Sequence, residues 1–258
     1  MFKLNPLGLV DGYKVDHRSQ YPLGTTTVYS NGTPRSNKIF ANTWAKHDNK
    51  YVSVGVEATV AYFIKEMFDE NFFSQPKEEV CASYKDIIED ALGPGAITFD
   101  HIRDLHDLGY LPVIIKALPE GTVANMKVPF MTILNTLPEF FWVTNYLETL
   151  LSAVTWKSIT NATIAREYRK LINEYAELTG CTDTPLDLQC HDFSMRGLSY
   201  TEDAMFSAMG HMTYFNGTDT FPVKQGTRNE VYRFSFNNLR YNLAEAPLLK
   251  TSDNRSVP

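Results

Sequence analysis

Residues 186–220, LDLQCHDFSMRGLSYTEDAMFSAMGHMTYFNGTDT, decide the fold class of this chain. Residues 186–193 predict a short strand. A second strand is expected to begin at Tyr214 and to end in the Gly-Thr-Asp-Thr turn at 217–220. The spacing between the two strands leaves room for one helix.

The sequence between these strands predicts that helix. Ser199 is followed three residues later by Glu202, which is the pattern of a capping box and predicts a helix over 200–212. A strand, a helix and a strand in this order indicate the opening of an α/β barrel or a parallel sheet. In such folds the chemistry lies where strands end and helices begin, which here means residues 191–197 and 217–220.

The first 180 residues mix strands and helices in the manner of an α+β domain. Strands are expected over 25–33, 111–118 and 128–134, and the strand at 111–118 is expected to be buried. Helices are expected over 56–67, 80–91, 98–108, from Pro138 to about residue 155, and over 164–178. Three of these helices are expected to end at Gly93, Gly109 and Gly180.

The expected fold class is therefore α/β, with an α+β amino-terminal domain over residues 1–183. The first βα units of an irregular α/β barrel follow over 184–221, and the barrel is incomplete. Residues 222–258 form a divergent tail in which RFSFNNLRYNL at 233–243 fits a hairpin.

Composition and charge exclude several classes of partner. The net charge of −6 gives no basic surface for nucleic acid or for an anionic membrane. Three widely spaced cysteines without a Cys-x-x-Cys pair indicate reduced thiols. The amino terminus has no signal-peptide core, and polar residues interrupt the most apolar region, 128–156. We expect a soluble, cytoplasmic protein.

Three side chains at the predicted strand ends are candidates for binding a ligand. Arg196, ahead of the predicted helix, can hold a phosphate together with the backbone N–H groups of the first turn, or it can pair with Asp192. Phe193 is either a core residue or a stacking platform for a planar ligand. Asp219 lies in a turn, where aspartates usually accept hydrogen bonds from their own backbone.

The histidines do not indicate a metal site. His191 and Asp192 are adjacent, but no second histidine lies at ligand spacing and no His-Glu-x-x-His motif occurs. His101 and His106, which have acidic neighbours, are expected on a solvated helix face. No metal ligand is therefore predicted.

Seven collinear segments within about residues 5–221 resemble the nicotinamide phosphoribosyltransferase family, and they resemble its amino-terminal portion. They are DGYKVDH at 11–17, VYSNGTPR at 28–35, LPVIIKALPEGT at 111–122, NTLPEFFWVTNYLETLL at 135–151, ITNATIAREYRKL at 159–171, HDFSMRG at 191–197 and GTDT at 217–220. The specificity comes from the number and order of the segments, because the last two motifs alone are short.

The resemblance implies an α+β domain packed on an irregular barrel, and a homodimer with its active sites at the subunit boundary. Phe193 matches the aromatic residue that stacks on one face of nicotinamide, and Tyr13 matches the aromatic residue that the other subunit supplies to the opposite face. Arg196 matches a contact to the phosphate side of the nucleotide, and Arg35 a further phosphate contact across the dimer. Asp219 matches the acidic residue that contacts the carboxamide.

The activity implied is that of a pentosyltransferase in NAD salvage. The ring nitrogen of nicotinamide attacks C1 of phosphoribosyl pyrophosphate, with Mg²⁺ on the leaving pyrophosphate, and no protein nucleophile is required. A carboxylate only accepts hydrogen bonds at neutral pH. Asp219 would therefore pair with the amide NH₂ of nicotinamide and repel the carboxylate of nicotinate.

The chain departs from the family pattern after residue 221. The family's catalytic histidine, its ribose contacts and its glycine-rich phosphate loop are not recognisable here, so no catalytic residue is identified. Two βα units cannot close a barrel, and we expect a truncated or split form that works as a homodimer or is completed by a second chain. The alternatives are a non-catalytic dimerisation partner of a full-length homologue and a nicotinate phosphoribosyltransferase, which Asp219 disfavours.

Overall fold

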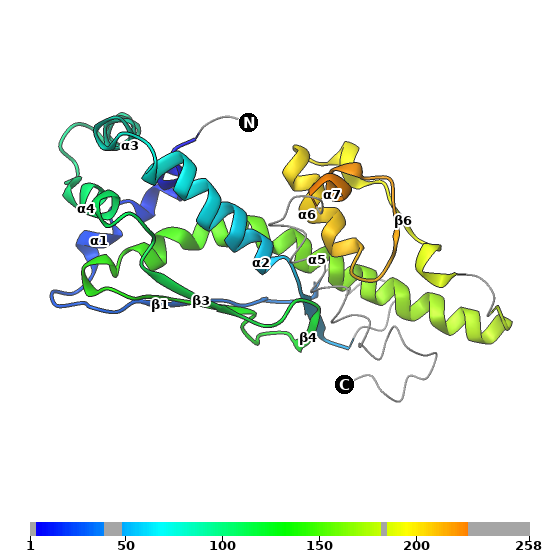
Figure 1. Cartoon of the computed structure of the whole chain (residues 1–258). Coiled ribbons are helices and arrows are strands. Elements are labelled where there is room, and N and C mark those ends of the chain that lie inside the picture. The colour runs from blue at the N-terminus through cyan, green and yellow to red at the C-terminus, as the bar shows by residue number, and fades with distance from the viewer. Residues whose placement is uncertain (1–3, 39–47, 182–184, 227–258) are drawn as a thin grey trace. The chain divides into compact units, whose positions relative to one another are not determined.

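A computed structural model describes residues 4–38, 48–181 and 185–226 of the chain (Figure 1). These residues form two compact units whose segments alternate along the sequence. The described residues of unit 1 are 4–32, 59–116 and 131–153. Those of unit 2 are 33–38, 48–58, 117–130, 154–181 and 185–226. The domain boundary after residue 183 stays a prediction.

Unit 1 is built mainly of helices. Its short and long helical elements are η1 Pro6–Gly8, η2 Gly12–Lys14, α1 His17–Gln20, η4 Val60–Glu66, η5 Asp69–Phe73, α3 Lys77–Leu92, α4 Asp100–Leu108 and η6 Pro138–Phe140. α2, Val56–Thr59, leads directly into the π-helical η4, so the helix predicted at 56–67 is confirmed. α3 and α4 end at Gly93 and Gly109 as predicted, because positive φ angles of 92° and 79° suit glycine there.

The sheet of unit 1 confirms three predicted strands and corrects the burial of one. β1 Tyr29–Gly32, β5 Met131–Asn135 and β3 Val113–Ala117 lie in the order β1-β5-β3, and β1 pairs antiparallel with β5. The prediction that 111–118 is a buried strand is wrong, since β3 is partly to fully exposed along its length and Ile114 is 47% exposed. Among the described strands β3 lies at the edge of this sheet beside β5, so the side chains of a second neighbouring strand do not cover it.

The core of unit 1 also corrects the prediction for His101. The largest fully buried side chains of this core are Leu7, Phe68, Phe72, Tyr84, Ile102, Leu105 and Leu151. His101, expected on a solvated face, is 6% exposed, and its ring meets that of Trp142 edge-on with 4.8 Å between centroids. Burial, with a smaller effect from Arg18, lowers the pKa of His101 to about 4. His106 is partly buried, with Nε2 3.0 Å from the carbonyl oxygen of Gln75.

α5, Val143–Thr179, is one helix of 37 residues that contributes residues to both units (Figure 1). The sequence predicted two helices, one ending near 155 and one over 164–178, and that division is wrong. No glycine or proline occurs within α5, so nothing in its sequence breaks the hydrogen-bond ladder. The helix ends before Gly180 as predicted, at a φ of 68°. Among the described helices, none is both long and apolar enough to cross a membrane.

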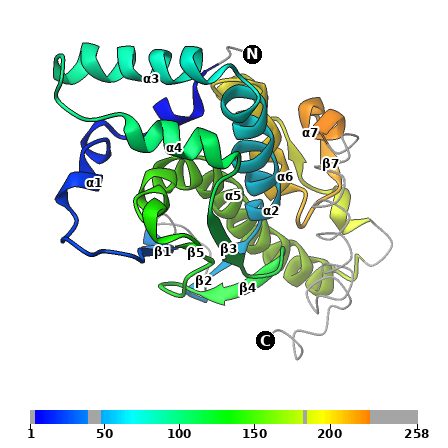
Figure 2. The same cartoon turned by 60° about the vertical axis from the view of Figure 1, so that its left-hand side comes forward.

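Unit 2 contains the predicted strand, helix and strand. β6 His191–Asp192, α6 Thr201–His211 and β7 Gly217–Thr218 follow one another, and β6 pairs parallel with β7. The chain then enters α7 Phe221–Gly226, which follows β7 (Figure 2). The strand predicted over 186–193 is shorter than expected, because Leu186–Leu188 forms the 3₁₀ turn η7. The hairpin predicted in the tail at 233–243 lies outside the described residues.

A second, antiparallel pair of strands in unit 2 was missed by the sequence analysis. β2 Lys50–Ser53 pairs with β4 Thr122–Asn125. Each strand has only four residues, too few for an alternating pattern to stand out, and the partners are about 70 residues apart in sequence. Val52 of β2 joins the core of unit 2 with these residues: Val54, Ala162, Ala165, Tyr214 and Phe215.

The start of α6 differs from the predicted capping box. The N-cap residue is Tyr200, and its side chain makes no capping hydrogen bond. The backbone N–H of Ser199 donates to Oδ2 of Asp203 at 3.1 Å, so Asp203 takes the position predicted for Glu202. Asp203 also forms an ion pair with Lys157. The helix is confirmed, but its first turn is supported by Asp203, which pairs with Lys157 of α5, and not by Glu202.

α6 packs closely on α5 at Gly210. A Cβ atom at Gly210 would lie 2.4 Å from the backbone oxygen of Ser158 and 3.0 Å from the backbone nitrogen of Ala162. The hydroxyl of Ser158 donates to the carbonyl of Phe206 at 3.0 Å across the same contact. Backbone atoms cannot move aside as a flexible side chain can, so only glycine fits at this crossing.

We expect Gly210→Ala to lower the free energy of unfolding by about 1–3 kcal/mol, because the added methyl forces the two helices apart. Urea unfolding followed by circular dichroism measures this change. Gly197→Ala is the control: a Cβ atom there meets nothing within 4 Å, and its effect should stay within about 0.5 kcal/mol. Equal effects of the two substitutions would contradict the close packing.

A buried carboxylate holds the loop that precedes α2 within unit 2. Glu120 is 7% exposed, and its two oxygens accept hydrogen bonds from the backbone N–H of Gly55 at 2.5 Å and of Glu57 at 2.9 Å. Burial raises the pKa of Glu120 to about 7, although these backbone donors oppose the rise. At neutral pH Glu120 is ionised in the unfolded chain, and folding shifts it toward the protonated form.

Glu120 should make stability fall as the pH rises. A folded pKa of about 7 against the ordinary value of 4.5 gives a stabilisation that is complete below pH 4.5 and is lost as the pH rises through 7. At 1.36 kcal/mol per pH unit, the loss between pH 5 and pH 8 is about 2–3 kcal/mol. Urea unfolding of the native chain and of Glu120→Gln at both pH values isolates the contribution of Glu120 to this pH dependence, because glutamine does not titrate. A pH dependence that survives in Glu120→Gln unchanged would assign it to other groups.

Candidate functional site

The carboxyl ends of β6 and β7 are tied together by Asp192. This residue is 8% exposed, and its carboxylate accepts hydrogen bonds from the backbone N–H of Ser194 at 3.1 Å and from the hydroxyl of Thr218 at 3.3 Å. Its carbonyl accepts from the backbone N–H of Asp219 at 2.9 Å. Phe193 and Asp219, which follow the two strands directly, are therefore brought to the same edge of the sheet.

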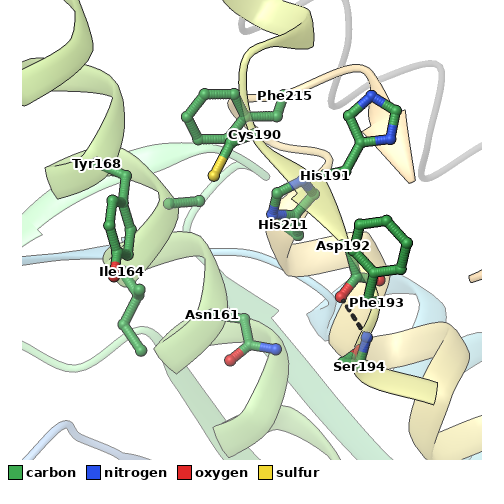
Figure 3. A pocket seen from close by; sticks show the side chains of 11 residues that line it. Asn161, Ile164, Tyr168, Cys190, His191, Asp192, Phe193, Ser194, His211 and Phe215 are labelled. Atoms are coloured by element: carbon green, nitrogen blue, oxygen red, sulfur yellow. Dashed lines mark hydrogen bonds between the residues drawn. The ribbon is translucent and has the colours of Figure 1, made fainter. Parts of the chain in front are cut away.

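A pocket of about 320 Å³ lies beside this edge (Figure 3). It is lined by α5, by β6 with the residues after it, and by the end of α6 with the turn that follows: Asn161, Ile164, Ala165, Tyr168, Cys190, His191, Asp192, Phe193, Ser194, His211 and Phe215. Along β6 the side chains alternate, so that Cys190 points toward α5 while His191 and Phe193 point away from it (Figure 3). Most of this lining is aromatic or aliphatic, which suits a flat, weakly polar ligand.

Phe193 is 71% exposed, so its ring is not a core residue of unit 2. Of the two alternatives for Phe193, that of a core residue is therefore wrong within the described part of the chain. Its ring lies 6.3 Å from that of His191, with 32° between the planes. An exposed aromatic face at a strand end is available for stacking.

His211 and Cys190 form the inner wall of the pocket. The ring of His211 stacks on that of Phe215 at 5.3 Å and 21°, and its Nε2 is 3.0 Å from the carbonyl oxygen of Gly217. Burial lowers the pKa of His211, and burial raises the pKa of the Cys190 thiol. Both residues are therefore favoured in their neutral forms, and neither is set up as a nucleophile.

Asp219 makes a contact that the sequence did not predict. Its Oδ2 lies 3.3 Å from Nδ1 of His191, and the two side chains are 53% and 45% exposed. Asp219 does not line the pocket itself, but His191 does. The hydrogen bond expected of a turn aspartate, from a nearby backbone N–H to its carboxylate, is not found within the described residues: the carboxylate faces His191, and the backbone N–H of Asp219 donates to the Asp192 carbonyl.

Arg196 and Arg35 are both exposed. Arg196 lies in the 3₁₀ turn η8, Ser194–Gly197, and within the part of the chain that the structure describes it forms no ion pair, with Asp192 or with any other acid. The alternative that Arg196 is neutralised by Asp192 is therefore not realised. Arg35 follows Pro34, whose carbonyl accepts from the backbone N–H of Lys127 at 3.1 Å. Neither arginine lines the pocket.

Tyr13 belongs to unit 1, on a segment anchored to the first turns of α5. The buried ammonium of Lys14 donates to Oε2 of Glu148 at 2.5 Å, and the hydroxyl of Thr149 donates to the carboxylate of Asp11 at 2.6 Å. Tyr13 itself is 65% exposed. Its neighbours hold the backbone in place. Its hydroxyl donates to Oδ2 of Asp11 at 3.4 Å and its ring lies 5.4 Å from that of His17, but most of the side chain is accessible to another molecule.

The sequence analysis missed several residues that line the pocket. Asn161, Ile164 and Tyr168 come from α5, more than 20 residues before β6. They lie in the segment 159–171 that resembles the family, but their helical spacing in the sequence indicated only a helix face and no pocket. His191 was placed at the strand end and was weighed as a metal ligand, but its spacing of two residues from Phe193 in a strand could also have indicated that both side chains share one face. Among the described residues, no group of three histidine, cysteine, aspartate or glutamate side chains could hold a metal ion.

The fold of the described residues is similar to that of a phosphoribosyltransferase of known structure. The structure resembles the crystal structure of human nicotinic acid phosphoribosyltransferase with a TM-score of 0.55 and 17% identity, over 83% of this chain and 37% of the human one. At this identity the likeness concerns the fold alone. It confirms the predicted α/β class.

Sequence comparison is more specific. The chain is 51% identical over 218 residues to the nicotinamide phosphoribosyltransferase of Acinetobacter baylyi and 28% identical over 222 residues to that of Mycoplasma pneumoniae. These matches cover 84% and 81% of this chain, and 43% and 48% of the two relatives. The chain is a homologue of the nicotinamide phosphoribosyltransferases and spans less than half the length of these two relatives. No protein-family model matches the sequence.

Alanine substitutions of Asp192 and of Arg196 should differ sharply in their effect on the free energy of unfolding. Asp192→Ala leaves the donors of Ser194 and Thr218 without their acceptor, and we expect a loss of about 1–3 kcal/mol in the free energy of unfolding. Arg196→Ala should change it by less than about 0.5 kcal/mol, since the side chain is exposed and forms no ion pair within the described residues. Urea unfolding measures both, and a large loss in Arg196→Ala would restore the pairing alternative.

Proposed function

We propose that this chain carries the nicotinamide-binding part of a nicotinamide phosphoribosyltransferase. In the reaction, nicotinamide and phosphoribosyl pyrophosphate give nicotinamide mononucleotide and pyrophosphate. The observation that supports this most is the parallel pairing of β6 and β7, which brings Phe193 and Asp219 to one edge beside an aromatic pocket. The homology to the Acinetobacter baylyi enzyme supports the choice of substrate.

The base is held by stacking in this proposal. Phe193, which is exposed, offers one ring face to the planar nicotinamide. Tyr13 of a second copy covers the opposite face, and its exposure on an anchored segment is consistent with that role. The proposed working form is accordingly a cytoplasmic homodimer. Neither residue changes its protonation during the reaction, so their contribution is orientation.

The phosphates are held by the two exposed arginines in this proposal. Arg196 and Arg35 offer planar guanidinium groups that bind phosphate oxygens bidentately. The ring nitrogen of nicotinamide attacks C1 of the ribose, the C1–O bond to pyrophosphate breaks, and the leaving group departs with its negative charge. Magnesium enters in this proposal with phosphoribosyl pyrophosphate, whose pyrophosphate oxygens are the hard ligands that this ion prefers.

Asp219 selects the amide over the acid in this proposal. Its carboxylate, in the ionised form, accepts a hydrogen bond from the carboxamide NH₂ and repels a second carboxylate. A nicotinate-using enzyme with this architecture would need a donor or a cation at this position. The human structure that shares the fold is named for nicotinic acid, but at 17% identity it carries no argument about the base.

We expect Asp219→Asn to shift base choice toward nicotinate. The test uses a chimera in which residues 5–221 of this chain replace the matching part of the Acinetobacter baylyi enzyme. Losing a hydrogen bond to a charged acceptor costs about 1.5–3 kcal/mol, so the ratio of kcat/KM for nicotinamide to that for nicotinate should fall at least roughly tenfold.

Glu174→Gln is the control for this measurement, since it removes one negative charge from an exposed position of α5 in the same unit. Its ratio of kcat/KM values should equal that of the unsubstituted chimera. An unchanged ratio in Asp219→Asn would make Asp219 a turn residue only.

A further inference from the structure

The contact between His191 and Asp219 fixes the position of one proton. Nδ1 of His191 lies 3.3 Å from Oδ2 of Asp219. An ionised carboxylate has no proton to give, so the hydrogen bond requires a proton on Nδ1. A neutral histidine in this contact is therefore the Nδ1–H tautomer, and the hydrogen bond of one ring nitrogen decides which nitrogen is protonated.

Gly217 makes the contact sterically possible. His191 and Gly217 are direct partners in the parallel register of β6 and β7. A Cβ atom at Gly217 would lie 2.5 Å from Cδ2 and 2.6 Å from Nε2 of the His191 ring. The imidazole therefore lies against the backbone of β7. The φ of Gly217 is not positive, so glycine is required here because it has no side chain and not because of its backbone conformation.

The Asp219 side chain needs such support. It is 53% exposed, and it follows β7 at the point where the chain turns toward α7. An exposed aspartate samples several rotamers, and a ligand that binds it must bear the entropy of fixing one of them. With Oδ2 held by His191, Oδ1 remains as an acceptor in a defined direction.

We propose that His191 is a positioning residue that orients the Asp219 carboxylate for the carboxamide of nicotinamide, with Gly217 providing the space for its ring. This inference rests on the proposed function for its ligand, but the pair itself is a property of unit 2. His191 acts through Asp219 and does not take part in the chemical step. The ring of His191 also lies near that of Phe193, so the same strand supplies the stacking residue and the support for the polar one.

The pair can be tested in the chain as it is. ¹⁵N chemical shifts of the imidazole, recorded above the titration range of histidine, report the tautomer of His191. We expect a predominance of Nδ1–H, and a shift of the tautomer ratio toward Nε2–H by roughly fivefold in Asp219→Ala, the size of one modest net hydrogen bond. Gly217→Ala should produce the same shift, because its methyl displaces the ring.

His106 provides an internal control in the same spectra. Its Nε2 faces the carbonyl of Gln75 at 3.0 Å, so it should remain the Nε2–H tautomer in every variant. Finding His191 as Nε2–H in the unsubstituted chain, or unaffected by Asp219→Ala, would overturn the pair whatever the activity of the protein.

The positioning role is tested in the chimera with the Acinetobacter baylyi enzyme. His191→Phe keeps a ring but loses the donor, and we expect KM for nicotinamide to rise several-fold and the preference for nicotinamide over nicotinate to fall, with kcat little changed. His191→Asn, whose amide nitrogen can take the place of Nδ1, should restore the preference. A structural role alone would lower activity with both bases equally and would not distinguish Phe from Asn.

The outcomes separate the positioning role of His191 from the proposed function of the chain. A chimera in which His191→Phe and His191→Asn show the same base preference as the parent overturns the positioning role, even if the ¹⁵N shifts establish the pair. A chimera that is selective for neither base contradicts the proposed function, and the pair between His191 and Asp219 is then decided by the ¹⁵N shifts alone.

Discussion

The buried carboxylate of Asp192 is the interaction on which the candidate site depends. Its two oxygens and its carbonyl accept from Ser194, Thr218 and Asp219, and these three hydrogen bonds connect the ends of two short parallel strands. β6 and β7 have only two residues each, so their own ladder is too short to fix the residues that follow. A side chain that links both strands replaces the missing length. Phe193 and Asp219 are held in position because Asp192, which links their two strands, is itself fixed by these hydrogen bonds.

The packing that supports these strands also depends on a few contacts, which α5 makes with α6. α6 approaches α5 to backbone contact at Gly210, and Lys157 of α5 holds Asp203 in the first turn of α6. The helix that links β6 to β7 is therefore fixed at both its beginning and its end by one long neighbour. α5 also supplies one wall of the pocket, so a single uninterrupted helix serves both the scaffold and the site.

The charged groups of the candidate site lie on exposed side chains. The groups that we assign to ligand contacts, Asp219, Arg196 and Arg35, are exposed, and their charges remain available to a substrate. The strongly shifted groups, such as His101 and Glu120, are buried elsewhere and serve the fold. A transfer reaction that depends on orientation and on charge needs fixed donors and acceptors, and it needs no group tuned as a nucleophile.

The sequence by itself determined the helices and their glycine ends, apart from the division of α5 into two. It also determined the strand-helix-strand order after residue 186 and the positions of Phe193, Arg196 and Asp219 after the strands. These depend on local propensity and on short motifs, which a single chain displays directly. Only the tertiary structure decided that β2 pairs with β4, that Asp203 rather than Glu202 supports α6, and that Asp219 faces His191. Each of these contacts joins residues distant in sequence or chooses between adjacent equivalents. The choice is made by packing, which no local pattern records.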